Sequence, residues 1–234
     1  MHQVALGSVI TLILAVGVAG RSPQFAAAPA PGRPVTWLVL VDDLHLDFRG
    51  TGRLRNVLKT SLDELVRDGD RVLVRSSGPS TMALQLSLTD PPFGRDLLAG
   101  AVKRTTGNAL KAEDITTPQA RREVRYRARV TVDTLRQLVD ASLPYEGATA
   151  VLYFSNGYAP GSMDLHALVE QTRRAGATLY ALDPRPAPRG RDDPFAMATR
   201  ASLRELANAT GGTWQDDGET LGDYLARVAA AVGR

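Results

Sequence analysis

The sequence predicts an α/β fold: a doubly wound, Rossmann-like, mostly parallel sheet with one antiparallel edge strand and helices on both faces. Three continuous apolar runs carry this prediction, at residues 35–42, 149–157 and 177–184. Continuous runs are typical of parallel strands that are covered on both faces. Segments with apolar residues at helical spacing separate the runs, and this alternation is typical of a doubly wound sheet.

The first half of the folded region adds two helices and two short strands. Apolar residues three or four positions apart predict a helix over 52–70. Strands are predicted over 71–77 and 81–89. The turn between them is so short that they must be antiparallel, so 81–89 is the predicted edge strand. A second helix is expected over 93–107.

The second half follows the same alternation. A long helix is predicted over 117–142, and shorter helices over 164–176, 202–212 and 222–232. A short strand at 213–214 completes the set. No internal repeat is visible in the sequence.

An uncharged apolar run at residues 4–20 precedes the fold. It is at the short end of what spans a bilayer, and small residues within and after it fit signal-peptide cleavage sites. Residues 1–20 are therefore interpreted as a signal peptide or an N-terminal membrane anchor, 21–34 as an Ala/Pro-rich linker, and 35–234 as one domain. We expect an exported protein that is periplasmic, secreted or anchored in the cell envelope.

The composition excludes several classes of function. Of the 234 residues, 44% are hydrophobic and 23% are charged, as in an ordinary globular protein. Cysteine is absent, which excludes disulfides, thiolate metal sites and a cysteine nucleophile. The net charge of +3 is too small to indicate a nucleic-acid partner without a clustered patch.

Polar residues follow the predicted parallel strands: Asp42 and Asp43, Ser155 and Asn156, and Asp183. In doubly wound sheets, ligands bind beyond the carboxyl ends of the strands, so this edge is the candidate working surface. Ser155 lacks the G-x-S-x-G turn of hydrolases, and no glycine-rich phosphate loop is present. The sequence therefore predicts a binding protein and no enzyme.

Six segments occur in an order that resembles a von Willebrand factor type A (VWA) domain, specifically the bacterial secreted VWA-related group. They are WLVLVDD, DGDRVLVRSSGPSTMALQLSLTD, TGNAL, AVLYFSNGY, RRAGATLYALD and LRELANATGG. The resemblance covers residues 35–232. It implies an adhesion-type protein-binding domain with a metal-ion-dependent adhesion site, in which D-x-S-x-S, a threonine and a second aspartate hold a divalent cation. A carboxylate of the partner completes the coordination shell.

Residue by residue, this implied metal site is degenerate. Asp42 matches the first aspartate, but Leu44 and Leu46 stand at the two serine positions. The threonine falls on Asn108 and the second aspartate on Asn156. One carboxylate and two amides remain, which weakens the attraction for a divalent cation. We expect no cofactor, Mg²⁺ at most weakly, and a protein partner at the loops of the carboxyl edge.

A set of residues shifted by one position is an alternative metal site. Asp43, His45 and Asp47 alternate, and in an extended segment they point the same way. With an imidazole among the ligands, such a site prefers Zn²⁺ or Mn²⁺, and with Asp42 it suggests a metal-assisted hydrolase. The other interpretation is that the two leucines between these residues turn inward and the polar residues face water.

Arg121, Arg125 and Arg129 form a stripe on the predicted long helix. They could contact an acidic partner or anionic lipid headgroups. In that case the protein is a structural subunit of an envelope assembly. The alternative is a solvated helix face with no partner.

Overall fold

The computed structural model describes residues 33–78, 100, 106–111, 115–159, 161, 165–186, 194–216 and 218–233, with backbone alone for 58–64. The predicted leader, the linker as far as residue 32, the predicted strand over 81–89 and most of the predicted helix over 93–107 lie outside these residues. The described elements are β1 (Val35–Val41), α1 (Phe48–Leu65), β2 (Arg71–Ser76), α3 (Pro118–Ser142), β3 (Ala148–Phe154), α4 (His166–Arg174), β4 (Ala177–Leu182), α5 (Pro194–Ala209) and α6 (Leu221–Ala231). None of the helices in this part of the chain is both long enough and apolar enough to cross a membrane.

The four described strands form one sheet in the order β2-β1-β3-β4, and every pairing is parallel. This confirms the doubly wound α/β prediction. The predicted antiparallel strand falls outside the described residues, so the described sheet is entirely parallel. The predicted short strand at 213–214 is present as a single parallel bridge between Trp214 and Ala181.

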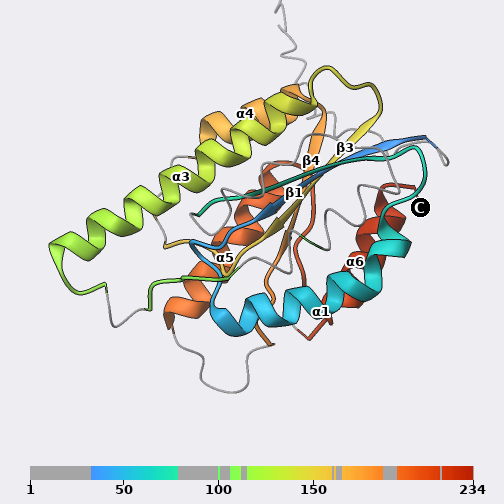
Figure 1. Ribbon diagram of the computed structural model, residues 1–234. Helices are drawn as coiled ribbons and strands as arrows, with labels where there is room; N and C mark the ends of the chain where they lie inside the picture. The colour runs from blue at the N-terminus through green and yellow to red at the C-terminus, as the bar shows by residue number, and fades with distance from the viewer. Residues whose placement is uncertain are drawn as a thin grey trace, which may run out of the picture.

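Helices cover both faces of the sheet, as the continuous apolar runs predict. One core lies between the sheet and the pair α1 and α6, and it includes Trp37 of β1 and Phe154 of β3. The other core lies against α3, α4 and α5 and includes the alternate strand residues, such as Leu38 and Tyr153. Figure 1 shows α3 and α4 side by side on one side of the sheet and α1 with α6 on the other.

Two helices begin earlier than the sequence predicts. α1 begins at Phe48 because the Asp47 carboxylate and carbonyl accept hydrogen bonds from the backbone N–H groups of Gly50 and Thr51. α5 begins at Pro194, where proline fits the first turn of a helix. The glycines in α1 and the proline-rich loop before α5 are not typical of helices, so the sequence pattern predicted neither start.

The strand register brings the polar strand ends together. Val41, at the end of β1, is aligned with Ser76 of β2 and Phe154 of β3, and Phe154 is aligned with Leu182 of β4. The residues that follow these positions therefore share one edge of the sheet. The strand order reverses between β1 and β3, which is where such sheets bind ligands.

Candidate functional site

The turn after β1 forms the centre of this edge. The backbone N–H groups of His45 and Leu46 both donate to the carbonyl of Asp42, at 3.0 and 2.8 Å. This tight turn points Leu44 and Leu46 into the protein, with 8% and 0% of their surface exposed. The two leucines pack inward as that interpretation has it, but its other half is wrong, because Asp43 is only 1% exposed and does not face water. Two positions at which a VWA metal site has hydroxyl ligands are filled by apolar side chains.

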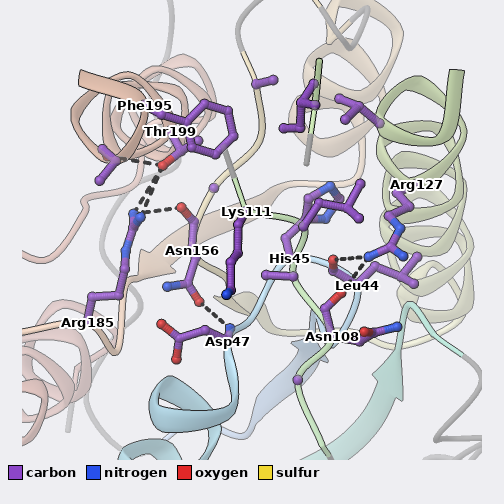
Figure 2. A pocket seen from close by; sticks show the side chains of 18 of the residues that line it. Leu44, His45, Asp47, Asn108, Lys111, Arg127, Asn156, Arg185, Phe195 and Thr199 are labelled. Atoms are coloured by element: carbon purple, nitrogen blue, oxygen red, sulfur yellow. Dashed lines mark hydrogen bonds between the residues drawn. The ribbon is translucent and has the colours of Figure 1, made fainter. Parts of the chain in front are cut away.

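A cavity of about 780 Å³ opens beside this turn. It is bounded by the segment 106–111, the first turns of α3 and the start of α5 (Figure 2). His45, Asp47, Asn108 and Asn156 line it, so the structure brings these four predicted site residues to one cavity. Asp42 and Asp43 are not among its lining residues.

The two asparagines have structural contacts at the cavity. The Asn156 side-chain carbonyl accepts a hydrogen bond from the Asp47 backbone N–H at 3.1 Å. The backbone of Asn108 donates to the carbonyl of Asp43 at 2.7 Å, and its own carbonyl accepts from Nη1 of Arg127. These bonds fix the β1–α1 turn against β3 and against the segment 106–111.

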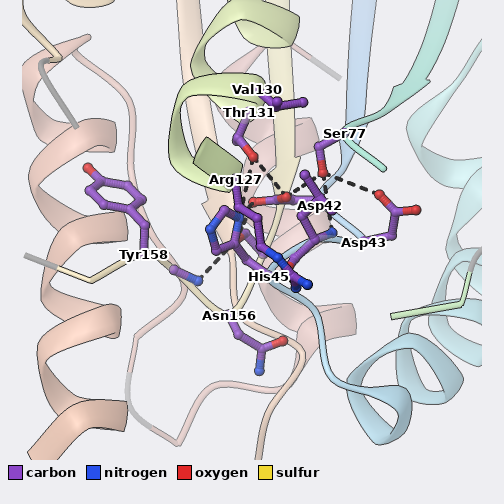
Figure 3. A network of polar contacts seen from close by, with 12 residues as sticks. Asp42, Asp43, His45, Ser77, Arg127, Val130, Thr131, Asn156 and Tyr158 are labelled. Atoms are coloured by element: carbon purple, nitrogen blue, oxygen red, sulfur yellow. Dashed lines mark hydrogen bonds and ion pairs between the residues drawn. The ribbon is translucent and has the colours of Figure 1, made fainter. Parts of the chain in front are cut away.

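The Asp42 carboxylate lies beneath the cavity, completely buried. It accepts hydrogen bonds from five side chains that come from the ends of three strands and from α3 (Figure 3). The donors are Ser77 Oγ (2.5 Å) and Thr131 Oγ1 (3.0 Å) to Oδ1, and His45 Nδ1 (2.9 Å), Tyr153 OH (2.7 Å) and Ser155 Oγ (2.9 Å) to Oδ2. We call these five side chains the donor cage. A carboxylate has about four lone-pair sites, so this one is fully satisfied.

The donor cage keeps Asp42 ionised. Burial by itself raises the pKa of the Asp42 carboxyl, but the charge of His45 and hydrogen bonds from His45, Ser77 and Tyr153 together hold that pKa below its ordinary value of 3.8. Burial and the Asp42 charge raise the pKa of Tyr153 well above 10, so its phenol remains a donor. Because an ionised carboxylate only accepts hydrogen bonds, Nδ1 of His45 carries the proton in this contact.

The alternative metal set does not converge. The Asp43 carboxylate accepts from Ser76 Oγ at 2.6 Å and from Ser77 Oγ at 3.2 Å, and Figure 3 shows it on the far side of Ser77 from His45. Nδ1 of His45 is bound to Asp42, and Asp47 caps the start of α1. A hydrolase needs Asp42, Asp43 and His45 on one ion, and this geometry gives that alternative no support.

The described residues do not fit the divalent cation that the resemblance implies. Among them, no group of three or more His, Asp or Glu side chains is close enough to hold a metal ion. Asp42 has no exposed oxygen, and the Asn156 oxygen is used by the Asp47 backbone. A cation would have to displace protein donors and lose its own water for a single carboxylate.

Arg121, Arg125 and Arg129 lie on the exposed side of α3. The buried residues of this helix begin only at Ala128, so its first turns project past the sheet (Figure 1). Within this part of the helix, an ion pair joins Arg127 to Glu123. The three arginines of the stripe form no ion pair with another described residue. The stripe is therefore a solvent-facing basic surface, separate from the cavity.

Sequence reasoning missed most of the donor cage. Ser77, Thr131 and Tyr153 come from the end of β2, from α3 and from the end of β3, and they share no motif. A signal was present in Thr131, a polar residue on the mostly apolar stripe of α3, and its side chain is completely buried. Buried polar side chains usually have a hydrogen-bond partner, so its position pointed to a polar group on the facing strand.

Comparison with known proteins supports the fold alone. No family model matches the sequence, and no curated protein matches it. The structure is similar to a von Willebrand factor type A structure from Catenulispora acidiphila, with a TM-score of 0.54 and 14% sequence identity. That match covers 86% of this chain and 43% of the other, so this chain spans less than half of that structure's length. The protein has a VWA-like fold.

Two further similarities are weaker. Proximal thread matrix protein 1 from the mussel byssus has a TM-score of 0.43 and 10% identity, covering 89% of this chain and 46% of that protein. The N-terminal domain of TFIIH p34 has a TM-score of 0.36 and 12% identity, covering 86% of this chain and 97% of that domain. Likenesses of this size carry no functional argument.

Proposed function

We propose that this VWA-like domain is a non-enzymatic, exported module that binds a protein partner at the carboxyl edge of its sheet without a divalent cation. VWA-like folds commonly mediate protein–protein interactions. The observation that carries the proposal is the donor cage. The one aspartate that matches the family's metal ligands is completely buried and accepts five side-chain hydrogen bonds.

The donor cage determines how much attraction Asp42 has left for a cation. Five donors already compensate the buried charge of Asp42, so little attraction is left for a cation above it. Recognition then depends on the shape and the side chains of the edge. Phe48, at the start of α1, is 72% exposed at this edge and is suited to contact a partner.

The apolar run at 4–20 and the linker at 21–34 support export. Cleavage releases the domain, whereas retention tethers it to the membrane by an extended linker. Under this proposal the module lies outside the cytoplasm in either case.

Calorimetric titration tests the independence from cations. We expect Mg²⁺, Mn²⁺ and Ca²⁺ to show no binding tighter than about 1 mM, because a site with one enclosed carboxylate lacks the charge of ordinary sites. Asp42→Ala serves as the comparison. Micromolar binding by the wild-type domain that disappears in Asp42→Ala would contradict the proposal.

Affinity capture from the native envelope tests the partner and its docking edge together. Phe48→Ser changes an exposed residue at the carboxyl edge, and Leu143→Ser is a matched control that is 61% exposed beyond the end of α3, at the opposite edge. We expect a partner that the wild-type and Leu143→Ser domains retain equally with Mg²⁺ or with EDTA, and that Phe48→Ser loses. Release of the partner by EDTA, or equal loss of the partner in Phe48→Ser and Leu143→Ser, would argue against the proposed cation-independent binding at the carboxyl edge.

A second candidate is a structural subunit of an envelope assembly that binds through the basic stripe. The projecting, exposed start of α3 favours it. Reversal of Arg121, Arg125 and Arg129 to Glu should then weaken association by at least about tenfold, because attraction becomes repulsion. Asn108→Ala, which alters the cavity, should leave association unchanged. The opposite pattern would assign binding to the carboxyl edge, and sedimentation of the assembly with each variant measures the difference.

A further inference from the structure

The cavity beside the β1–α1 turn has the size of a small-molecule site. Its volume of about 780 Å³ lies within the range of roughly 300–1,000 Å³ that is usual for organic ligands. Its walls come from segments far apart in the chain: the turn after β1, the segment 106–111, α3 and the start of α5. Hydrogen bonds such as Ala109 N–H to the Leu46 carbonyl, at 3.0 Å, tie these segments together. The hollow is therefore a formed site between fixed elements.

One part of the cavity wall is apolar and incompletely covered. Leu110, Ile115, Val124 and Phe195 line it, and each is only half-buried. They converge on one hollow from the segment 106–111, the residues before α3, α3 itself and α5. Apolar side chains that gather at a concave surface favour an occupant with an apolar body.

The charged groups of the wall are mostly cationic. Arg49, Lys111, Arg127 and Arg185 line the cavity, and Asp47 is the one carboxylate among its lining residues. Two of these cations are ion-paired just outside the lining, Arg127 with Glu123 and Arg185 with Asp183, each at 2.7 Å, so the excess of positive charge is small. Figure 2 shows the Lys111 side chain reaching across the hollow toward Asn156 and Asp47, with Arg127 on another side. The Asp47 carboxylate already accepts a hydrogen bond at the start of α1. The wall thus favours a negatively charged group on the occupant.

Arg127 is held in place in a way that suits the binding of an anionic group. Its Nε donates to Glu123 at 2.7 Å, and its Nη1 donates to the Leu44 carbonyl at 3.2 Å and to the Asn108 carbonyl. Nη2 makes no hydrogen bond with any residue in the part of the chain that the structure describes. A guanidinium that backbone carbonyls hold in place loses little conformational entropy when it binds an anion.

We propose that this cavity binds a small amphipathic organic anion, with its apolar body against Val124 and Phe195 and its acidic head beside Lys111 and Arg127. Nothing in this inference depends on a protein partner. It adds a small-molecule site to the edge at which partner binding is proposed. A bound molecule there would cover apolar wall that the free domain exposes.

Fluorescence titration with 1-anilinonaphthalene-8-sulfonate tests the site, because this dye is a small anion with an aromatic body. The neutral dye N-phenyl-1-naphthylamine is its matched control. We expect saturable binding of the anionic dye with one site per domain, and binding of the neutral dye that is at least about tenfold weaker, as expected for the loss of a charge-assisted contact. Equal affinity for the two dyes, or no saturable binding of the anion, would overturn the proposal.

Two variants at one position locate the site. Val124→Asp places a negative charge on the cavity wall, and Val124→Asn has nearly the same shape without the charge. We expect the anionic dye to bind Val124→Asp at least about tenfold more weakly than Val124→Asn. Urea denaturation and circular dichroism of both variants show whether they are folded. If folded Val124→Asp and Val124→Asn bind the dye equally, the dye occupies another surface and the proposal is wrong.

The outcomes also separate this inference from the proposed function. A domain that binds the dye as expected but captures no partner keeps the small-molecule site and loses the interaction module. A domain that captures a partner through Phe48 but binds no dye keeps the interaction module and loses the small-molecule site.

Discussion

Asp42→Asn is expected to lower the free energy of unfolding at pH 7 by about 3 kcal/mol, because breaking a buried charged network leaves its other members without a partner. The amide offers one acceptor oxygen where the carboxylate offers two. Its NH₂ group would also face side chains that now donate hydrogen bonds. Such a loss is a large part of the stability of an ordinary domain. Urea denaturation of the two proteins measures it.

The pH dependence of this difference identifies the charge as its cause. The folded-state pKa of Asp42 lies below its ordinary value of 3.8, so the charge contributes stability above about pH 4. That contribution is lost as the pH falls through the folded-state pKa, and the gap between wild type and Asp42→Asn should narrow there. Asp133→Asn, on the exposed side of α3, is the control and should change stability by less than about 0.5 kcal/mol. A pH-independent gap, or no gap at pH 7, would contradict the role of the donor cage.

Gly157→Ala is expected to lower the free energy of unfolding by about 3 kcal/mol, from overpacking and an unfavourable backbone conformation together. Gly157 follows β3 and has a φ of +82°, a region that favours glycine. A Cβ atom there would lie 1.9 Å from the backbone carbonyl oxygen of Thr199 in α5. The helix would have to move away from the edge of the sheet, and the cavity that it borders would change shape.

Gly176→Ala is a matched control for this prediction. Gly176 has a φ of +63°, but a Cβ atom there meets no atom within 4 Å. Its substitution should therefore cost only about 1–2 kcal/mol, the backbone contribution. The difference between the two unfolding free energies isolates the clash with α5. If the two variants are equally stable, α5 does not lie against the glycine as described.

The sequence predicts the sheet well because a strand that is buried on both faces is apolar at nearly every position, and such runs are easy to recognise. Runs such as VTWLVLV and ATAVLYF are apolar at every position or nearly so, and both are strands in the structure. Helix starts are harder to predict from the sequence, since a single cap residue such as Asp47 or a proline such as Pro194 decides them. A local contact of one side chain is easily obscured by neighbouring glycines and prolines.

The candidate site is only partly visible in the sequence. The strand-end rule and the resemblance identify Asp42 and Asn156, and the inward packing of Leu44 follows from its apolar character. The donors to Asp42 lie between 3 and 113 positions away along the chain, so no local pattern contains them. Hydroxyl groups are also common in sequences, and only the fold shows which of them face one carboxylate.

The central place of β1 in the sheet has a consequence for the order in which the chain can fold. β1 is the first of the described strands to be synthesised, yet one of its two neighbours is β3, which begins at Ala148. A nascent chain that ends before this residue leaves one side of β1 without its partner. Contacts between such distant segments slow folding, so the sheet around β1 should stay open until β3, which ends at Phe154, has been synthesised.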